Sequence, residues 1–392
     1  MISRSLTIAL LIFISIGIRF IDFQGVLLSL LLIGLNLKSF NKISVKDKNR
    51  ILFIVFFFII SMLFNYNQTD LRLVFVLMLF VFSAYSAIIT YKSLPISILE
   101  DDIIRVLKLF SLHAFIGYIL LLFFSDQFTR LEGTLNRSFM HMFFVSHSNW
   151  NGIPRNTGLF WEPGVMQLIP NLLFFYAVKN QLKFYWILLS ILLIITAFST
   201  TGFVVLFTNI LYLIYVKSKN VRKNLILILV VLLSIGLFTS VIERDVQQKL
   251  DLENTSGLIR MRDIFLSWEL IKEKPLFGHG IVDLDYIERK GYASNVEQSL
   301  FTEDYLKENG YMDGGFTNGF FGGIVFFGIP IGCWMFYLLY NNGIVGNGIE
   351  NKLTFFCLMA ISLFSEPILF TPLFAFLIIS GRLTPSPSNK TA

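Results

Sequence analysis

Residues 155–178 read RNTGLFWEPGVMQLIPNLLFFYAV and join a polar segment directly to a long apolar run. The polar part holds Arg155, Trp161 and Glu162, and a proline and a glycine follow it. Apolar runs of this kind recur along the chain, in which 55% of the 392 residues are hydrophobic and only 15% are charged. A soluble domain carries about 25% charged residues, so this composition predicts a polytopic membrane protein.

The apolar runs predict an all-α fold with about twelve transmembrane helices and two long extracytoplasmic loops. The helices are expected at roughly 5–21, 24–37, 51–65, 72–90, 108–124, 164–178, 184–198, 202–216, 225–241, 319–340, 353–365 and 367–380. The chain is thereby divided into N-terminal helices (1–124), a first long loop (125–163), central helices (164–241), a large second loop (242–318), C-terminal helices (319–381) and a tail (382–392). Several runs are short, which favours tilted helices or a locally thinned bilayer.

Lysine and arginine are concentrated in the short loops 38–50 and 217–224, which lie on one side of the membrane if the helices alternate. Such a bias marks the cytoplasmic side. Both termini are therefore expected in the cytoplasm, and both long loops on the outer face. Most of the Asp and Glu residues fall in these outer loops, so the functional site is expected there. The net charge of +6 reflects the loop pattern and does not indicate a nucleic-acid partner.

The second long loop contains SGLIRMRDIFLSWELIKEKPLFGHG, residues 256–280. Apolar residues recur at helical spacing on one face, namely Met261, Ile264, Phe265, Trp268 and Ile271. The pattern predicts an amphipathic helix on the outer surface of the membrane, with this face toward the lipid and Pro275 at its end. Arg260 and Arg262 lie in its early turns. They either snorkel and pair locally, as Arg260 can with Asp263, or bind a diphosphate, which suits the planar arginine fork.

Polar residues near the late spans have two interpretations each. Gly278, His279 and Gly280 are expected to form a flexible turn, in which His279 either binds phosphate or is solvated. Asn318 either contacts sugar or serves the local turn. Glu366, between the last two spans, is a functional candidate because charge is costly there, and otherwise it caps the helical hairpin.

The sequence lacks the usual patterns for metal or nucleotide binding. It has no CxxC, HExxH or Walker motif, and Cys333 and Cys357 both fall within predicted spans. His141 and His147 have no partners at ligand spacing. We therefore expect neither a metal nor a cofactor.

Three motifs, taken together with the order of spans and loops, resemble the Wzy-type polysaccharide polymerases of the O-antigen polymerase and ligase group. The motifs are RNTGLFWEPG before a span, Arg-x-Arg followed by PLFGHG in a large outer loop, and FTNGFFGGIVFFGIPIG at a late span. The resemblance covers about the second half of the chain.

The resemblance implies a GT-C-like glycosyltransferase of the bacterial cytoplasmic (inner) membrane. Such an enzyme transfers an oligosaccharide chain from a polyprenyl diphosphate onto the non-reducing-end sugar of a newly flipped repeat unit, at the outer face. Neither a nucleotide sugar nor an obligatory metal is implied. The implied partners are the lipid-linked oligosaccharide, membrane lipids, and a chain-length regulator and a flippase of the same pathway.

Arg155 and Glu162 suit the two chemical tasks of that reaction. An arginine stays charged and stabilises the departing diphosphate, whereas a carboxylate in a partly dry site takes a proton from the attacking hydroxyl. Alternatively, the two side chains form a buried ion pair that fixes the loop. Trp161 between them is either an interfacial anchor or a surface for sugar stacking.

Two rival functions are weighed against the polymerase. The ligase branch typically has His-Asn or a similar pair before its late glycine-rich span, where this chain has Thr317-Asn318. Some members also show an Arg-x10-Gly spacing, whereas Met166 and Glu273 stand at those positions here. A flippase or other transporter is the non-enzymatic rival. It would line its path with charge at midplane depth, but the predicted spans are nearly free of charge.

Overall fold

A computed structural model describes much of the chain and leaves several segments undescribed. The described residues are 2–18, 20, 23–42, 65, 70–92, 94–130, 137–140, 143–146, 149–150, 153–217, 255–281, 318–346 and 348–381. The predicted spans 51–65 (apart from its last residue) and 225–241 lie outside them. So do most of both Lys/Arg-rich loops and residues 282–317 of the second long loop.

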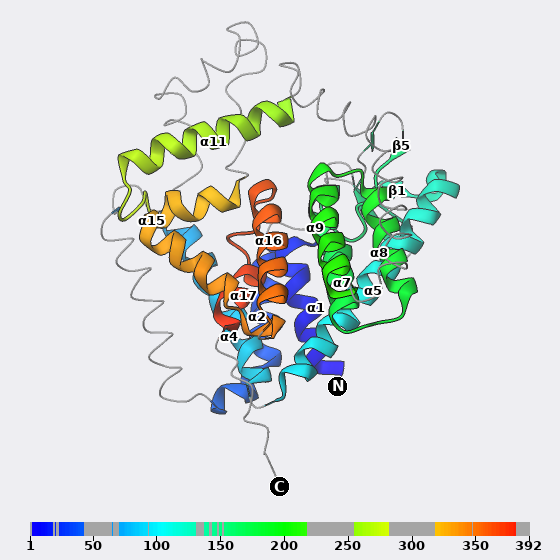
Figure 1. Cartoon of the computed structure of the whole chain (residues 1–392), viewed down its shortest axis with the longest axis horizontal. Coiled ribbons are helices and arrows are strands. Elements are labelled where there is room, and N and C mark those ends of the chain that lie inside the picture. The colour runs from blue at the N-terminus through cyan, green and yellow to red at the C-terminus, as the bar shows by residue number, and fades with distance from the viewer. Residues whose placement is uncertain are drawn as a thin grey trace, which may run out of the picture.

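Helices make up most of the described structure, as Figure 1 shows. The α-helices are α1 (Ile2–Ile16), α2 (Gln24–Leu35), α4 (Leu71–Tyr91), α5 (Ile96–Phe123), α6 (Pro163–Met166), α7 (Leu168–Lys179), α8 (Phe184–Ala197), α9 (Thr200–Lys217), α11 (Thr255–Glu273), α15 (Gly319–Tyr340), α16 (Ile349–Ser365) and α17 (Pro372–Ser380). Short 3₁₀ helices lie at η1 (Leu37–Lys42), η3 (Ser125–Gln127) and η4 (Gly343–Val345). Each predicted span within the described residues overlaps one of these helices.

Among the residues that the structure describes, three helical segments are long and apolar enough to cross a membrane, namely α4, α5 and the segment Gly319–Val345. α1, α2, α8 and α9 are shorter apolar helices. Large apolar side chains also face outward, such as Leu27, Leu30 and Leu31 of α2, each at least 50% exposed. Soluble proteins rarely expose such patches. The chain is therefore a helical membrane protein, whereas the total of twelve spans stays a prediction.

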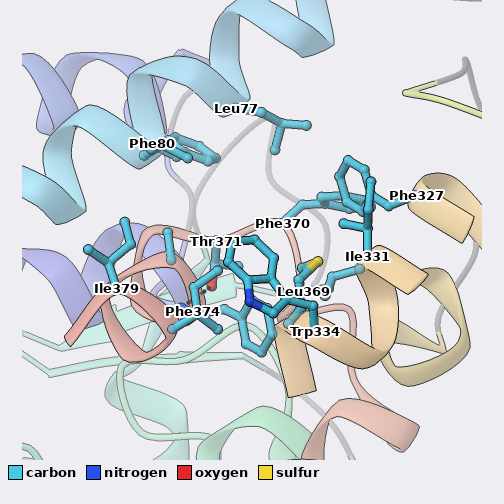
Figure 2. Close-up of a pocket in the computed structure, with 14 residues that line it drawn as sticks. Leu77, Phe80, Phe327, Ile331, Trp334, Leu369, Phe370, Thr371, Phe374 and Ile379 are labelled. Carbon is cyan, nitrogen blue, oxygen red and sulfur yellow. Dashed lines mark hydrogen bonds between the residues drawn. The ribbon is translucent and has the colours of Figure 1, made fainter. Parts of the chain in front are cut away.

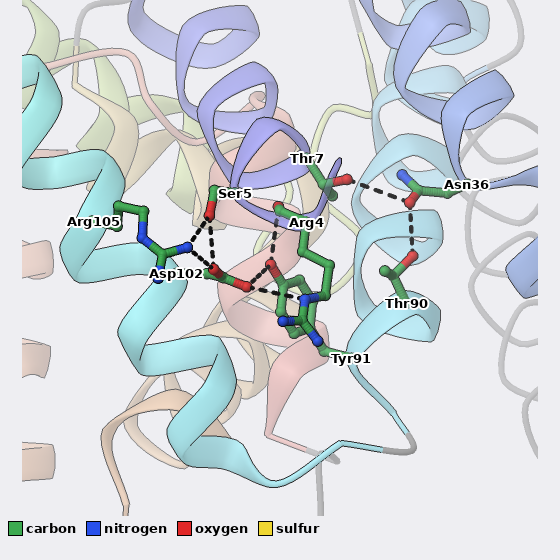
Figure 3. Close-up of polar contacts among 8 residues, drawn as sticks. All are labelled: Arg4, Ser5, Thr7, Asn36, Thr90, Tyr91, Asp102 and Arg105. Atoms are coloured by element: carbon green, nitrogen blue, oxygen red, sulfur yellow. Dashed lines mark hydrogen bonds and ion pairs between the residues drawn. The ribbon is translucent and has the colours of Figure 1, made fainter. Parts of the chain in front are cut away.

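At one end of the bundle, a buried carboxylate connects three helices. Asp102 of α5 is 2% exposed and accepts hydrogen bonds from the Ser5 hydroxyl (2.7 Å) and the Tyr91 hydroxyl (3.0 Å). It also pairs with Arg105 at 3.1 Å and with Arg4 at 3.5 Å, as Figure 3 shows. A buried charge needs such partners. These contacts tie α1, α4 and α5 together, and we call this the Asp102 end.

The opposite end carries α11, which lies across the bundle in Figure 1, and we call it the Glu366 end. The α15 helix bends there at Gly328, which has φ 80° and ψ 166°, and Pro330 follows within the helix. A proline inside a helix removes a backbone hydrogen bond and kinks the helix. The first arm of α15, residues 319–327, runs beneath α11, and the second arm descends into the bundle.

Short strands lie within the first predicted loop, which the all-α prediction did not anticipate. A three-stranded antiparallel sheet has the order β1 (Thr129–Arg130), β2 (Arg137–Met140) and β3 (Phe143–Ser146), and β4 (Asn149–Trp150) pairs with β5 (Ile153–Pro154). In the β2–β3 pair Phe139 lies opposite Phe144, and their rings stack at 6.0 Å. The prediction was wrong here because such short strands give only a weak periodic signal.

Candidate functional site

A buried carboxylate lies at the centre of the Glu366 end. Glu366 directly follows the last residue of α16 and is 2% exposed. Its carboxylate lies against Gly164 of α6, so closely that a methyl group on Gly164 would overlap it. The backbone N–H of Glu366 donates to the Ser362 carbonyl at 2.9 Å. The position is therefore set by the end of α16 and by a glycine that leaves it room.

Several helix ends converge on this residue. The Thr201 hydroxyl, in the first turn of α9, donates to the Ser365 hydroxyl at 2.7 Å. Gly319, the first residue of α15, packs against the Glu366 carbonyl, from which an added Cβ would be 3.0 Å away. α9 and α15 both begin here, and helix N-termini carry a partial positive charge that favours anions. The C-terminus of α16 carries a partial negative charge, so the electric field at Glu366 is the sum of two positive helix ends and one negative one.

The segment that precedes α6 is fixed to the end of α8. Arg155 donates from Nε to the Ala197 carbonyl (3.1 Å) and from an Nη to the Phe198 carbonyl (2.7 Å). A cation at a helix C-terminus satisfies terminal carbonyls and complements the helix dipole. Asn156 donates to the Thr196 hydroxyl at 3.1 Å and so adds a second contact. Arg155 thus fixes this segment through the carbonyls at the end of α8, whereas the structural role weighed from the sequence was an ion pair with Glu162. The diphosphate role of Arg155 stays a prediction.

Glu162 occupies a different environment from Glu366, although it lies only two residues before Gly164. It is the N-cap residue of α6, its side chain is exposed, and it makes no capping hydrogen bond. Trp161 beside it is half-buried and packs against the main core. The segment is also held at Phe160, which forms a β-bridge with Gly17. The structure therefore brings one exposed and one buried carboxylate to the start of the same short helix.

The α11 helix is present where the sequence predicted it, and it packs against the bundle through a different face from the apolar one. That the apolar face lies toward the lipid stays a prediction. Phe265 and Trp268 are 49% and 58% exposed, whereas Arg262, Asp263 and Leu266 are buried. The buried positions continue along the helix at Ser267, Leu270 and Ile271. Periodicity could not decide the face, because the buried stripe starts with two charged residues instead of apolar ones.

Arg262 and Asp263 form a buried ion pair on that inner face. The Arg262 Nη and the Asp263 Oδ1 are 3.0 Å apart, and the side chains are 2% and 0% exposed. Asp263 thus pairs with Arg262, and the pairing with Arg260 that the sequence analysis weighed stays a prediction. Arg260 lies in α11, but its side chain falls outside the described residues. Removing charges from water is costly, so such a pair contributes little net stability unless its geometry is excellent.

The Gly278-His279-Gly280 segment is packed, and the prediction of a flexible turn was wrong. Gly278 and Gly280 have φ values of +64° and +77°, which L side chains rarely adopt. The His279 N–H donates to the Val325 carbonyl (2.8 Å), and the Gly280 N–H donates to the Phe326 carbonyl (2.9 Å). These are carbonyls that the bend in α15 exposes. The segment therefore supplies donors for the carbonyls at the kink and joins α11 to α15.

His279 and Asn318 both have structural partners. His279 is fully buried, and its Nε2 lies 2.9 Å from the Leu270 carbonyl, which can only accept, so Nε2 carries the proton. Asn318 is the N-cap of α15, and its side-chain oxygen accepts from the Phe321 N–H at 3.0 Å. The local role weighed for Asn318 is thus present. Substrate contacts by either residue stay predictions.

A polar ladder inside the bundle was missed by the sequence analysis. Asn171 of α7 donates to the Gln167 side-chain oxygen at 2.7 Å, and Asn209 of α9 donates to the Asn171 side-chain oxygen at 3.0 Å. All three residues are fully buried. Amides four residues apart within an apolar run were the available signal, because polar groups inside a span are costly and seek partners. In the described part of the chain, no cluster of His, Cys, Asp and Glu is arranged to hold a metal ion.

Comparison with known proteins found a family model that matches part of the chain. Residues 185–327 match the family model described as O-Antigen ligase. The matched region includes α9, α11 and the first arm of α15, and therefore Arg262 and the Gly278-His279-Gly280 segment. It begins after Arg155 and Glu162 and ends before Glu366. No curated protein matches the chain.

Proposed function

We propose that this chain, an O-antigen polymerase/ligase-type protein, polymerises lipid-linked oligosaccharide repeat units at the outer face of the bacterial cytoplasmic membrane. The growing chain on its polyprenyl diphosphate is the donor, and the non-reducing-end sugar of a new repeat unit is the acceptor. The Glu366 end is the outer face in this proposal, and both termini are cytoplasmic.

The observation that carries the proposal is the group of buried charges at the Glu366 end, opposite the Asp102 end of the bundle. Glu366 and the Arg262–Asp263 pair are buried there, and α9 and α15 begin there. Buried ionisable groups in a membrane protein mark functional sites more often than structural ones. A diphosphate needs fixed positive charge, which arginine and helix N-termini supply without reorganising.

The reaction assigns one task to each kind of group. The acceptor hydroxyl oxygen attacks the anomeric carbon, the bond from that carbon to the diphosphate oxygen breaks, and the hydroxyl proton moves to a carboxylate. Glu162 is proposed as that base, because its side chain lies at the start of α6 beside the site and is open to an acceptor hydroxyl. Its exposure differs from the partly dry environment expected from the sequence. Arg155 and Arg262, with Arg260, are proposed to stabilise the departing diphosphate.

The remaining residues are proposed to shape the substrate site. Trp161 offers a half-buried ring beside Glu162 for sugar stacking. Asn318 caps α15, the helix that begins at the site. Gly278, His279 and Gly280 hold α11 in place. A direct contact with substrate is proposed for these residues in addition to their structural roles.

Ligation to a different acceptor is the second candidate, because the matched family model is described as O-Antigen ligase. Against it, Asn318 stands next to Thr317, where the ligase branch has a histidine-containing pair. Purified protein given only polyprenyl-diphosphate repeat units, without metal or nucleotide, distinguishes the two. A ladder of longer chains supports the polymerase. Transfer of single units to an added acceptor, with no ladder, would refute the polymerase function and support ligation.

A further inference from the structure

Two cavities in the described part of the chain differ in their chemistry. One, of about 130 Å³, opens between α4, the second arm of α15 and α17, and its lining holds no ionisable side chain, as Figure 2 shows. Nothing in that lining selects one occupant. The other has a volume of about 480 Å³ and lies at the Asp102 end, between α5 and the turn that joins α7 to α8. Its lining includes charges of both signs, namely Glu100, Asp101, Arg105 and Lys108.

Two of these four charges already have partners within the protein. Glu100 pairs with Lys179 at the end of α7, and Arg105 pairs with the buried carboxylate of the same end of the bundle. Asp101 and Lys108 have neither an ion pair nor a hydrogen bond with another described residue. The cavity therefore presents one anion and one cation to a ligand, and its volume is within the range of about 300–1,000 Å³ that small-molecule sites have.

The charged part of α5 is expected at the surface of the bilayer. The helix has 28 residues and rises about 42 Å at about 1.5 Å per residue, whereas the hydrocarbon core of a bilayer is about 30 Å thick. All of its Asp, Glu, Lys and Arg residues fall between 100 and 108. The Lys108 Nζ lies 4.8 Å from the centre of the Trp186 ring, and tryptophan is enriched where the membrane meets water. The cavity is therefore placed at the depth of lipid headgroups.

Beyond the cavity, α5 presents a continuous apolar face. Its exposed side chains recur every three or four residues and are 37–75% exposed, namely Leu109, Leu112, Ile116, Ile119 and Phe123. Residues at this spacing share one face of a helix, and this face continues the one that carries the charges. α5 is long and apolar enough to cross a membrane, so the acyl chains of lipid contact such a face.

The order of these groups along α5 indicates the kind of ligand. From the water inward, an anion at Asp101 is followed by a cation at Lys108 and then by apolar side chains. Phosphatidylethanolamine presents the complementary groups in the same order, with its ammonium outermost, its phosphate next and its acyl chains inward. Asp101 and Lys108 are seven residues apart and therefore share one face, about 10 Å apart along the helix axis. A ligand that carries both charges can contact both side chains.

We propose that this cavity binds the phosphoethanolamine headgroup of a phospholipid, with the phosphate paired to Lys108 and the ammonium paired to Asp101. Both contacts are charge-assisted hydrogen bonds. An anionic headgroup without an ammonium satisfies Lys108 and leaves Asp101 beside a phosphate. The bound lipid joins α5 to the α7–α8 turn, because Asn180 and Leu182 of that turn line the same cavity. The inference does not rest on the proposed reaction, since the cavity lies at the opposite end of the bundle from Glu366.

The expected selectivity is modest. An exposed ion pair changes a binding constant by a factor of about five at most, because water competes for both charges. We therefore expect phosphatidylethanolamine to bind about two- to fivefold more tightly than phosphatidylglycerol, which has the same phosphate and no ammonium.

The test is a competition, followed by native mass spectrometry of the full chain in detergent, between equimolar phosphatidylethanolamine and phosphatidylglycerol with identical acyl chains. Wild type should carry the ethanolamine lipid in about two- to fivefold excess as its first bound lipid. Asp101→Asn removes the partner of the ammonium and should abolish the excess. Asp126→Asn makes the same substitution at an exposed residue beyond the other end of α5 and should retain it. Equal binding by wild type, an excess of phosphatidylglycerol, or an unchanged excess in Asp101→Asn would overturn the proposal.

A lipid series tests the same contact without a substitution. The N-methyl and N,N-dimethyl derivatives and phosphatidylcholine keep both charges but lose the N–H donors one by one. Binding to wild type should fall in that order, whereas Asp101→Asn should bind all four lipids alike. A level series in wild type would refute the contact between the ammonium and Asp101.

Two further measurements test the phosphate contact and the source of the headgroup. Lys108→Gln should weaken the binding of phosphatidylethanolamine and phosphatidylglycerol alike, and unchanged binding of both would remove Lys108 from the site. Soluble glycerophosphoethanolamine has the headgroup without the acyl chains that contact the apolar face of α5. It should not displace the lipid at equal concentration, and displacement would show that the ligand is a soluble phosphoethanolamine instead of a membrane lipid.

Discussion

Replacing Gly164 with alanine puts a methyl group where the structure has the Glu366 carboxylate. The carboxylate has little room to move, because Glu366 is 2% exposed and its backbone is held by Ser362 at the end of α16. Overpacking of this kind typically costs about 1–3 kcal/mol. Alanine in a helix normally gains about 1 kcal/mol over glycine, so the net loss of stability should be at most about 2 kcal/mol.

Gly34→Ala in α2 is the matched control, because nothing lies within 4 Å of a Cβ added there. It should leave the thermal unfolding midpoint of the detergent-solubilised protein unchanged or raise it. The midpoint of Gly164→Ala should fall below that of Gly34→Ala. Chain elongation by Gly164→Ala should also fall, by about tenfold or more, because a shift of 1 Å at a site costs up to about 10² in rate.

Shortening the carboxylate should relieve the overlap. Gly164→Ala combined with Glu366→Asp should recover stability relative to Gly164→Ala alone, with a coupling energy of about 0.5–3 kcal/mol. The reasoning fails if Gly164→Ala matches Gly34→Ala in both stability and elongation. It also fails if the stability changes of the substitutions at Gly164 and Glu366 are additive, because the effects of substitutions at residues in contact should not simply add.

Three further substitutions test the charged residues of the candidate site. Arg262→Ala leaves Asp263 buried without its cation and should cost about 3–5 kcal/mol of stability; adding Asp263→Ala should restore the unfolding midpoint but not elongation. Arg155→Ala removes two hydrogen bonds to the end of α8; it should abolish long chains and lower the free energy of unfolding by about 1–3 kcal/mol. Arg155→Lys should recover part of the activity and part of the stability. A normal ladder from Arg155→Ala would exclude Arg155 from the reaction. Glu162→Gln should leave the unfolding midpoint unchanged, because the side chain is exposed and makes no capping hydrogen bond. It should slow elongation by about 10²–10⁴. A fall in protein abundance with normal turnover would instead indicate a structural role.

The helices were the predictable part of this fold. α11 ends at Glu273, ahead of Pro275, as the sequence indicated, and each predicted span within the described residues overlaps a helix. Apolar runs and proline or glycine punctuation carry this information locally, because a lipid-buried backbone must satisfy its own hydrogen bonds as a helix. The small strands at 129–154 were not predictable, since each depends on pairing with a partner and has only a few residues.

Side-chain environments depend on long-range contacts and could be predicted only in part. The sequence singled out Glu366, but not that Gly164, some two hundred residues earlier, makes room for it. It also singled out Arg155, but its hydrogen bonds to the end of α8 depend on how two helices and a loop meet. Asp102 was not singled out from the sequence, although it is the buried centre of the Asp102 end.

The bend in α15 explains why the Arg262–Asp263 pair has a fixed place relative to Glu366. Gly328 and Pro330 interrupt the helix, and the freed Val325 and Phe326 carbonyls accept from the segment that follows α11. The Ile329 N–H donates in turn to the Pro275 carbonyl at 2.8 Å. Backbone hydrogen bonds therefore join α11 to the first arm of α15, and that arm begins against Glu366. In the proposed reaction, charges fixed in this way would stabilise the departing diphosphate without first having to reorganise, which is the property that makes electrostatic catalysis effective.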